Sequence, residues 1–345
     1  MPISREAEIT AIIPHYNGVE ILQDCLQSLE DNSIIPLKVI LVDNGSTDSS
    51  VAMAESKFTD VEILKMGENL GFAGGCNAGI RAADTPYVLI LNNDTLHKKG
   101  WLEHLLNRIK SSDNIAAVQP RLLSHQNHGK FDYSGAAGGE MDIFGYPFAR
   151  GRFFEHIEVD DDQYNKPEEI FWASGTAFLA RRNILLEAGL FDEDYFAHME
   201  EIDLDWRLHL MGYEIMYEPQ SIIWHRSGYT LGAETFLKKY LNHRNSLVTL
   251  LSNFKLFTTA YLSPMRLVLD WLSIFTSLLK GDYKRSLAVL KAHGWILLHP
   301  FKIYKKRKKV SDLRKIGDFD VMKKMYIGSI ALMFYLFKKK TYSDL

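Results

Sequence analysis

Cysteine is scarce in this chain of 345 residues, which contains only Cys25 and Cys76. Two cysteines exclude a disulfide framework and a cysteine-based zinc site, and they favour a reducing compartment. The first ten residues carry no long apolar stretch, so we expect no secretory signal peptide. No uninterrupted apolar run reaches the ~18–20 residues that a bilayer-spanning helix needs. The longest, residues 325–337, has 13.

Acidic residues are nearly absent from the last third of the chain. Residues 235–345 contain no Glu, 6 Asp and 22 Lys or Arg, a balance of +16, whereas residues 1–234 contain 18 basic and 37 acidic residues, a balance of −19. The overall charge of −3 hides this division. Such asymmetry indicates a nucleic-acid or membrane contact for the basic part. Because the acidic part repels phosphate at long range, we expect no nucleic acid and favour an anionic membrane surface.

The basic part also contains apolar stretches that could lie on a membrane. Lysines bracket the run 325–337, while the stretch 256–279 is interrupted by Pro264, Arg266 and Asp270. Lysine clusters beside aromatic and leucine side chains suit a helix in the headgroup region. A helical subdomain packed on the core and a homodimer contact are the alternatives. If the membrane reading holds, removal of residues 235–345 should release the protein into the soluble fraction.

The first 120 residues alternate apolar runs with helical patterns. The runs are nearly continuous, as in strands of a parallel sheet that is buried on both faces. They lie at residues 9–14, 38–42, 61–64 and 87–91, with helical patterns at 19–29, 52–58, 74–83 and 101–109. This order predicts an α/β fold, a mostly parallel sheet with flanking helices, whose ligands bind beyond the carboxyl ends of the strands.

The remaining residues are less regular. We expect loops and a hairpin over residues 121–170, then a strand at 176–180 and helices at 182–188 and 200–211. Long apolar and basic helices follow. The chain therefore divides into a catalytic domain, residues 1–234, and a basic helical region, residues 235–345.

Four motifs follow the expected strands. They are Pro14-His15-Tyr16-Asn17, the turn Asp43-Asn44-Gly45-Ser46, the glycine-rich segment Asn69 to Gly79, and Asn92-Asn93-Asp94. Asp43 could accept a hydrogen bond from a base or a ribose, and Asp94 could bind a divalent cation, which prefers oxygen ligands. The glycine-rich segment is not a P-loop, because no Lys-Ser or Lys-Thr follows it. Taken singly, the Asp43 motif favours an ordinary turn, the Asp94 motif is equally compatible with one, and the glycine-rich segment is weak evidence.

Two further motifs carry ionisable groups. Glu200 and Glu201 open a helix, where the macrodipole favours carboxylates and where an ionised carboxylate can accept a proton from an alcohol. His225 closes a short apolar run and could be a ligand or a structural residue.

In order and spacing, these segments resemble family 2 glycosyltransferases of the GT-A fold, and the Asn-Asn-Asp form resembles the rhamnosyltransferase-like branch. The resemblance covers residues 9–230 and rests on IPHYN, VDNGSTD, ENLGFAGGCN, LNNDT, SGTAFLARR, MEEIDLDWR and IIWHRSG. It implies a Rossmann-like sheet, a nucleotide diphosphate sugar donor and a Mn²⁺ or Mg²⁺ cofactor.

The resemblance also implies roles for single residues. Asp94 and His225 would bind the metal, and Glu201 would be the catalytic base, with Glu200 or Asp203 as alternatives because the family has Asp where this chain has Glu201. Trp172, Ser174, Gly175 and Asp203 would shape the acceptor and sugar site. The donor pocket would comprise Pro14, Tyr16, Asn17, Asp43, Asn69, Gly71, Asn77, Asn92 and Asn93.

We therefore expect an inverting, metal-dependent transferase that moves a sugar, in the nearest branch rhamnose, to a hydroxyl of a glycan or lipid-linked glycan during polysaccharide synthesis. The basic region would hold it at the inner face of the cytoplasmic membrane. One alternative is a sugar nucleotidyltransferase, although PHYNGVEILQD lacks the basic phosphate-binding loop that such enzymes use. Another is a non-catalytic peripheral membrane or nucleotide-binding protein.

Overall fold

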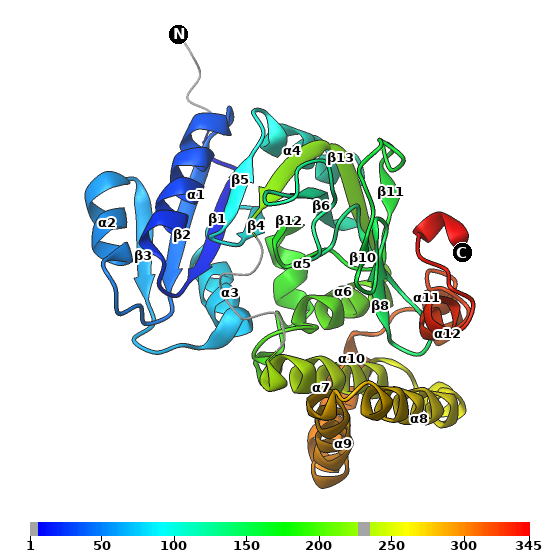
Figure 1. Cartoon of the computed structure of the whole chain (residues 1–345). Coiled ribbons are helices and arrows are strands. Elements are labelled where there is room, and N and C mark those ends of the chain that lie inside the picture. Colours follow the sequence, from blue (N-terminus) through cyan, green and yellow to red (C-terminus); the bar gives the residue numbers. More distant parts are fainter. Residues whose placement is uncertain (1–5, 227–234) are drawn as a thin grey trace.

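The computed structural model describes residues 6–226 and 235–345. Its strands and helices follow one another as Figure 1 shows. The strands are β1 (Ile9–His15), β2 (Leu37–Asp43), β3 (Val61–Lys65), β4 (Tyr87–Leu91), β5 (Thr95–His97), β6 (Ile115–Ser124), β7 (Gly139–Met141), β8 (Pro147–Ala149), β9 (Arg152–Phe153), β10 (His156–Ile157), β11 (Glu168–Glu169), β12 (Ala177–Arg181) and β13 (Glu214–His225). The helices are α1 (Val19–Asn32), α2 (Ser50–Lys57), α3 (Gly71–Ala82), α4 (Trp101–Lys110), α5 (Arg182–Glu187), α6 (Glu200–Leu210), α7 (Phe236–Asn253), α8 (Leu256–Leu279), α9 (Tyr283–Leu298), α10 (Pro300–Leu313), α11 (Asp318–Met322) and α12 (Ile330–Tyr335), with short 3-10 turns at Glu193–Tyr195 and Tyr342–Asp344.

A nine-stranded sheet forms the centre of the molecule. Its order is β11-β13-β6-β12-β4-β1-β2-β3, and β5 pairs with β13 outside this path. The strands β3, β2, β1 and β4 are parallel, and β6 and β13 are parallel to each other. Between these groups β12 runs antiparallel to both β4 and β6. The carboxyl ends of β1, β2 and β4 therefore meet at one edge, where the order of the sheet changes.

Helices cover both faces of this sheet, because successive strand residues point to opposite sides. Residues such as Ile13 and Leu89 pack with α1 and α4 on one face, and Ile12 and Ile90 pack with α3, α5 and α6 on the other. A smaller sheet, β7 to β10, lies beside the large one, and its Phe153 packs against α12. The expected α/β architecture of GT-A type, with a helical C-terminal region, is confirmed.

The first helices of the C-terminal region are part of this core. The helix α7 packs against α6, α9 and α10, and its buried side includes Leu247, Val248 and Leu250. Figure 1 shows α7, α8 and α9 gathered at one end of the molecule, below the sheet. The division at residue 234 stays a prediction, and α7, which begins just after the boundary, contacts α6 of the first part.

The sequence-based expectations were wrong in two places. The region 121–170 is not only loops and a hairpin, since it contains part of the ten-residue strand β6 and the small sheet. The apolar stretch 256–279, which Pro264, Arg266 and Asp270 interrupt in the sequence, nevertheless forms one helix, α8, through all 24 residues. The run 325–337 is not one helix: only Ile330–Tyr335 is helical, and this short helix packs on the small sheet.

The surroundings of Arg266 and Asp270 explain how α8 accommodates two charged residues. Arg266 and Asp270 form an ion pair, at 3.2 Å, on the buried side of α8, so their charges do not interrupt the helix. By length and composition α8 is the one helix, among the described residues, that could cross a membrane, and a single such helix is weak evidence for a span.

Candidate functional site

The turns after β1 and β2 are locked to each other. In the parallel register His15 lies opposite Asp43. The Asp43 carboxylate accepts a hydrogen bond from the Ser46 amide at 2.8 Å. The Asn17 side-chain oxygen accepts one from the Thr47 amide, also at 2.8 Å, and Asn17 has a positive φ of 56°. These contacts hold the expected base and ribose residues at the carboxyl edge of the sheet.

His15 joins these turns to the end of β4. Its Nδ1 lies 2.7 Å from the Asn93 amide nitrogen, and its Nε2 lies 2.8 Å from the Ser50 hydroxyl. Burial lowers the pKa of His15 against the opposing effect of Asp48 and Asp43, so the neutral ring can accept the hydrogen bond from Asn93. Asn93 is therefore a link between strands as well as a residue of the edge.

The other expected donor residues surround this edge. Tyr16 is exposed beside the first turn, and Pro14 contacts Gly75 of α3, where an added Cβ would lie 3.2 Å from Pro14. The backbone amide of Asn92 donates to the carbonyl of Thr176 at 2.9 Å, which connects the Asn-Asn-Asp turn with the segment before β12.

Asp94 and His225 lie side by side although 130 residues separate them. The antiparallel pairing of β5 with β13 places Thr95 opposite His225. Asp94 Oδ1 is 3.0 Å from His225 Nε2, and Asp132 Oδ1 is 2.9 Å from His225 Nδ1. Burial alone would lower the pKa of His225, but Asp94 and Asp132 outweigh it and raise the pKa to about 10. The local field therefore favours positive charge.

This arrangement fits a divalent cation. Two ligands at right angles, each about 2.1 Å from an octahedral ion, are about 3.0 Å apart. The Asp94 oxygen and the His225 nitrogen have this separation. Asp132 holds the other ring nitrogen, as carboxylates commonly do behind a metal-binding histidine. Among the described residues no group of three His, Cys, Asp or Glu side chains is arranged as a complete metal site, so donor oxygens and water would complete the coordination.

A strained loop leads into the carboxylate pair. Phe196, His198 and Met199 have positive φ values of 64°, 67° and 73°, which non-glycine residues rarely adopt. The buried side-chain amide of Asn245, in α7, donates to the carbonyls of Ala197 at 3.0 Å and of His198 at 2.7 Å. Because these contacts hold the carbonyls just before α6, they fix where Glu200 and Glu201 point.

Glu200 and Glu201 are adjacent carboxyl groups, of which Glu200 is buried and Glu201 is partly buried. Burial raises the pKa of Glu201, and burial together with the neighbouring Glu201 raises the pKa of Glu200. One oxygen of each has no hydrogen-bond partner among the described residues. A carboxylate that is short of hydrogen bonds and has a raised pKa is suited to accept a proton from an alcohol.

Glu201 lies beside the segment that leads to the metal residues. An added Cβ on Gly175 would lie 4.0 Å from the Glu201 carboxyl carbon. The next residue, Thr176, accepts the amide hydrogen of Asn92, two residues before Asp94. The structure therefore joins the carboxylate pair and the Asn-Asn-Asp turn through one short segment.

The glycine-rich segment contacts the strained loop. The amide of Phe72 donates to the carbonyl of Phe196 at 3.2 Å. At Gly71, whose φ is +71°, an added Cβ would approach that carbonyl oxygen to 2.6 Å, so only glycine fits. The Asn69 side chain accepts the Gly71 amide at 2.9 Å. Asn69 and Gly71 thus place the start of α3 against the loop before Glu200.

Three residues expected at the site use their side chains for hydrogen bonds within the protein. The Asn77 amide binds the backbone of Phe191 at 2.9 Å and 3.0 Å. The Asp203 carboxylate binds Arg207 at 2.9 Å and faces α7 rather than the edge of Glu201. The Ser174 hydroxyl donates to the backbone carbonyl of Ser134. Asn77 and Asp203 consequently support the site from within the protein, which was not expected.

Trp172 is buried against the small sheet. Its indole nitrogen donates to the Glu140 carbonyl at 2.8 Å. Gly139 passes so close that an added Cβ would lie 2.0 Å from the ring. The following residue, Ala173, donates its amide to Asp205 of α6 at 2.7 Å. Trp172 thus fixes the segment that carries Ser174 and Gly175.

Sequence reasoning missed Asp132, His15 and Asn245 as parts of the site. Asp132 lies in a loop after β6, in a stretch with no clear pattern, and only the fold brings it to His225. Asn245 belongs to the region that we assigned to membrane contact. His15 lies at the end of the first expected strand, but we assigned donor binding to the residues beside it, Pro14, Tyr16 and Asn17.

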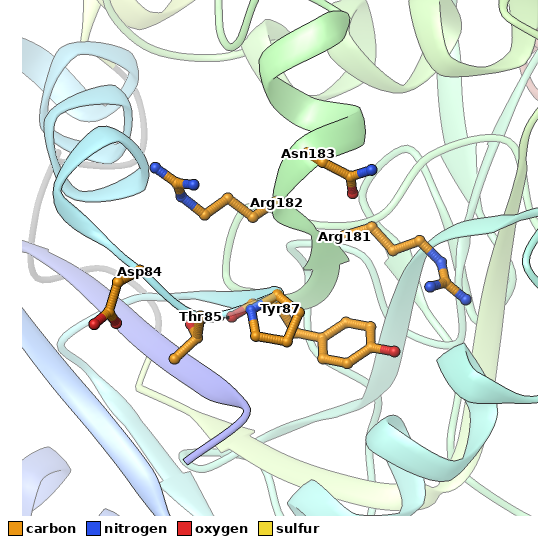
Figure 2. A pocket seen from close by; sticks show the side chains of 7 residues that line it. Asp84, Thr85, Tyr87, Arg181, Arg182 and Asn183 are labelled. Carbon is orange, nitrogen blue, oxygen red and sulfur yellow. Dashed lines mark hydrogen bonds between the residues drawn. The ribbon is translucent and has the colours of Figure 1, made fainter. Parts of the chain in front are cut away.

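A hollow of about 440 Å³ lies at the opposite edge of the sheet, around Tyr87 and Arg181. Figure 2 shows Arg181 and Arg182 extending away from each other there. Arg181 donates to the carbonyl of Ile109, and Arg182 to that of Ile80, near the ends of α4 and α3. These arginines bind helix carbonyls, and the hollow lies at the edge opposite the Asn-Asn-Asp turn.

The arrangement can now be compared with known proteins. The sequence profile of the glycosyl transferase family 2 matches residues 10–188, just over half of the chain. The chain belongs to glycosyl transferase family 2. It is therefore a glycosyltransferase, and the family that the motifs predicted is confirmed. The family assignment displaces the nucleotidyltransferase and the non-catalytic alternatives.

Among curated relatives, an N-acetylglucosaminyl-diphospho-decaprenol L-rhamnosyltransferase of Mycobacterium tuberculosis is 26% identical over 66% of this chain and 79% of its own length. A poly-beta-1,6-N-acetyl-D-glucosamine synthase of Staphylococcus epidermidis is 25% identical over 65% of this chain, and the match spans about half of that longer protein, 51%. These relatives support the expectation of polysaccharide synthesis and of likeness to rhamnosyltransferases.

Solved structures support the fold. A mannosyltransferase from Pyrobaculum calidifontis, in complex with GDP-Man and Mn²⁺, has a TM-score of 0.51 at 16% identity and covers 89% of this chain and 85% of its own. GalNAc-T7, with UDP, GalNAc and Mn²⁺, has a TM-score of 0.55 at 13% identity, over 71% of this chain and 47% of its own.

Proposed function

We propose that this glycosyltransferase transfers a sugar with inversion, in a metal-dependent reaction, from a nucleoside diphosphate sugar to a hydroxyl of a glycan or lipid-linked glycan. The observation that carries the proposal is that a candidate metal pair and a candidate base are connected at one edge of the sheet. Asp94 and His225, 3.0 Å apart, suit a cation beside a diphosphate, and the Glu201 carboxyl suits proton transfer. The turns after β1 and β2, which carry residues proposed for the donor, lie at the same edge of the sheet.

In this proposal Asp94 and His225 would hold the metal, with Mn²⁺ or Mg²⁺ as candidates and Mn²⁺ favoured by the mixed ligand set. The ion, when bound, supplies positive charge that stabilises the negative charge of the leaving diphosphate. Asp132 keeps the His225 ring in its orientation through Nδ1. Asp43 and Asn17 hold the turns against which the base and the ribose would lie.

Glu201 acts as the base. It takes the proton from the acceptor hydroxyl while the hydroxyl oxygen forms a bond to the anomeric carbon of the donor sugar. The bond between that carbon and the diphosphate oxygen breaks on the opposite face, and the nucleoside diphosphate leaves with the electron pair. A single displacement of this kind inverts the anomeric centre and needs no covalent enzyme intermediate. Asn245 positions the base through the strained loop.

The sugar and the acceptor are the finer part of the proposal. Likeness to the rhamnosyltransferase, whose own name includes a diphospho-decaprenol acceptor, favours rhamnosyl transfer to a lipid-linked glycan. An enzyme that uses such an acceptor would work at the inner face of the cytoplasmic membrane. The net charge of +16 in residues 235–345 supports this location.

The test begins with a thermal-shift screen of uridine, guanosine and thymidine diphosphate sugars with Mn²⁺ and with Mg²⁺, because a ligand of the folded state raises its stability. The binding donor is then supplied with acceptors, and the release of nucleoside diphosphate and the anomeric configuration of the product are measured. We expect inversion and dependence on the metal. Retention of configuration, or full turnover in a chelator, would contradict the proposal.

A further inference from the structure

The helix α8 has its charges inside and its apolar residues outside. Its buried side includes Arg266 and Asp270, each 1% exposed, together with Thr259 and Ser277. Its exposed side carries large apolar side chains without any charge. The most exposed are Leu256, Phe257, Tyr261, Trp271, Phe275 and Leu279, between 58% and 82% exposed. A helix in water has the opposite arrangement, so this face is adapted to a non-aqueous neighbour.

The inner side of α8 is fastened to the protein. Arg266 donates to the carbonyl of Phe144 at 2.7 Å and to the hydroxyl of Ser246 at 3.0 Å. Asp270 accepts from the Tyr146 hydroxyl at 2.8 Å and lies 3.0 Å from His293. Because these contacts are buried and charged, the helix cannot turn its apolar face inward without breaking them.

The next two helices also carry exposed apolar residues. In α9 the exposed residues include Leu287 and Leu297, and at the junction with α10 they include Leu298 and Phe301, which is 80% exposed. Figure 1 shows α9 projecting away from the sheet and α8 lying across the same end of the molecule. We call this exposed apolar side of α8, α9 and the start of α10 the outer face. Exposed apolar residues grouped in this way differ from the scattered exposure of an ordinary surface.

Basic residues surround the outer face. Residues 255–311 contain 12 Lys or Arg and only two acidic residues, Asp270 and Asp282. Asp270 is buried, and Asp282 pairs with Lys239 at 2.7 Å. A hollow of about 370 Å³ at the start of α8 is lined by Lys255 and Lys308 among others. Lys302 and Lys306 pair with Asp194 and Asp192, and the other basic side chains leave an excess of positive charge in this segment, which suits phosphate headgroups.

We propose that the outer face binds the surface of a bilayer that contains anionic lipids, with α8 lying in the plane of the interface. The apolar side chains would enter the headgroup boundary while the lysines pair with lipid phosphates. A second copy of the chain is a poorer occupant, because a two-fold contact would bring equal positive charges together. The helix does not cross the bilayer, because Arg266 and Asp270 stay bound to the protein.

This inference deepens the proposed function by giving the enzyme a location. Membrane binding itself is argued from α8, and only its benefit for the reaction rests on the proposed function. The helix α8 follows α7 directly, and α7 holds the loop before Glu200 through Asn245. Docking of α8 would therefore hold the catalytic body at the surface where a lipid-linked acceptor lies. Donor binding and turnover with a water-soluble acceptor are measured separately, so loss of either would count against the proposed function alone.

The first experiment measures sedimentation of the full chain with vesicles of phosphatidylcholine, with and without phosphatidylglycerol. A triple variant carries Phe257→Gln, Trp271→Gln and Phe275→Gln. A matched control replaces three exposed apolar residues elsewhere, and its changes are Ile34→Gln, Val159→Gln and Leu186→Gln. We expect binding that requires phosphatidylglycerol, that weakens with salt, and that falls at least about 10-fold in the triple variant but not in the control.

Folding of the triple variant is checked by its melting temperature and by donor binding, which should match those of the unchanged chain. Equal vesicle binding by the triple variant and the unchanged chain would overturn the proposal. A dimer in light scattering that the triple variant converts to a monomer, without vesicle binding by either protein, would overturn it in favour of a second copy.

The second experiment measures depth. Both native cysteines, Cys25 and Cys76, are fully buried, so a fluorescent thiol label goes to an introduced cysteine. The single variants are Phe257→Cys, Met265→Cys and Phe275→Cys. For a helix in the interface plane, lipids brominated at a shallow carbon should quench all three labels to a similar degree. A steep change, with the deepest label in the middle, would indicate a spanning helix and overturn the proposal.

Discussion

Replacing Glu201 by glutamine should stabilise the folded protein at neutral pH while it removes turnover. The Glu201 carboxyl is buried, one of its oxygens has no hydrogen-bond partner among the described residues, and burial raises its pKa. For an acid whose pKa is higher in the folded state, the contribution to stability is fully present below the unfolded pKa of about 4.3 and is lost as pH rises through the folded pKa. An amide carries no such dependence.

The size of the effect follows from the same shift. Each unit by which the folded pKa exceeds the unfolded one corresponds to about 1.4 kcal/mol. The variant should therefore equal the unchanged chain near pH 4 and gain stability with increasing pH until the folded pKa is passed. Glu200 adds to this difference, because the loss of the neighbouring charge also lowers the pKa of Glu200. For domains of this size each kcal/mol moves the melting temperature by about 2–4 °C.

The assay is a series of thermal melts between pH 4 and pH 8, read by circular dichroism, beside nucleoside diphosphate release. The control is Glu187→Gln, an exposed position in α5, for which we expect no increase with pH. A Glu201→Gln protein that is destabilised equally at every pH would refute the reasoning about burial. One that melts as expected but turns over normally would remove Glu201 from the role of base.

Three further predictions concern the same edge of the sheet. Asp94→Asn should abolish metal-dependent donor binding in calorimetry, and an unchanged titration would exclude Asp94 as a ligand. Asp132→Asn should weaken metal affinity by about 10–100-fold, because the His225 ring loses its carboxylate partner; equal affinity would show that Asp132 does not orient the ring. Asn245→Asp, which cannot donate to the loop carbonyls, should lower kcat while donor affinity is retained, and a fall in donor affinity alone would indicate a different role.

The strands of the first half were predictable because their sequence carries the information locally. The runs at 9–14 and 87–91 are apolar at nearly every position, and the structure places β1 and β4 there almost residue for residue. The strand β13 was harder. Only its end was foreseen, because Glu214 to Gln220 mix polar and apolar residues and the strand has irregular register against β6. Pairing across the sheet, rather than local pattern, decides such a strand.

The features of the site also divide into those that the sequence predicts and those that only the fold brings about. That Asp94 follows a buried strand can be read from the sequence, but its contact with His225 depends on the pairing of β5 with β13. The contact with Asp132 depends on a loop that has no periodic pattern. For Asp203, helical geometry decides: residues two apart lie on different sides of a helix, so Asp203 turns toward α7 when Glu201 faces the edge.

The helix α8 shows why a count of uninterrupted apolar residues can overlook an apolar helix face. Counted along the sequence, Arg266 and Asp270 exclude a continuous apolar segment. In the structure they lie one turn apart on the same side and neutralise each other against the protein. The apolar residues then share the opposite side, which is the arrangement that a count of uninterrupted apolar residues cannot detect.

The contacts of α7 change the expected result of removing residues 235–345. That deletion takes away Asn245, which holds the loop before Glu200, and Asn253, which donates to Asp203 at 2.8 Å. It also uncovers Trp206, whose ring packs 4.8 Å from that of Phe254. A buried carboxylate left without its donor and a core aromatic exposed to water both favour unfolding. We therefore expect the truncated chain to aggregate.

Measurement of soluble yield and of donor binding would check this expectation. A well-folded, active fragment 1–234 would show that α7 is dispensable and would restore the boundary at residue 234. If the fragment aggregates while the triple α8 variant stays folded and leaves the vesicles, the C-terminal region has two separable roles. The helix α7 would complete the catalytic body, and the outer face of α8 would bind the membrane, so the boundary between chemistry and docking would lie near Lys255, where α8 begins.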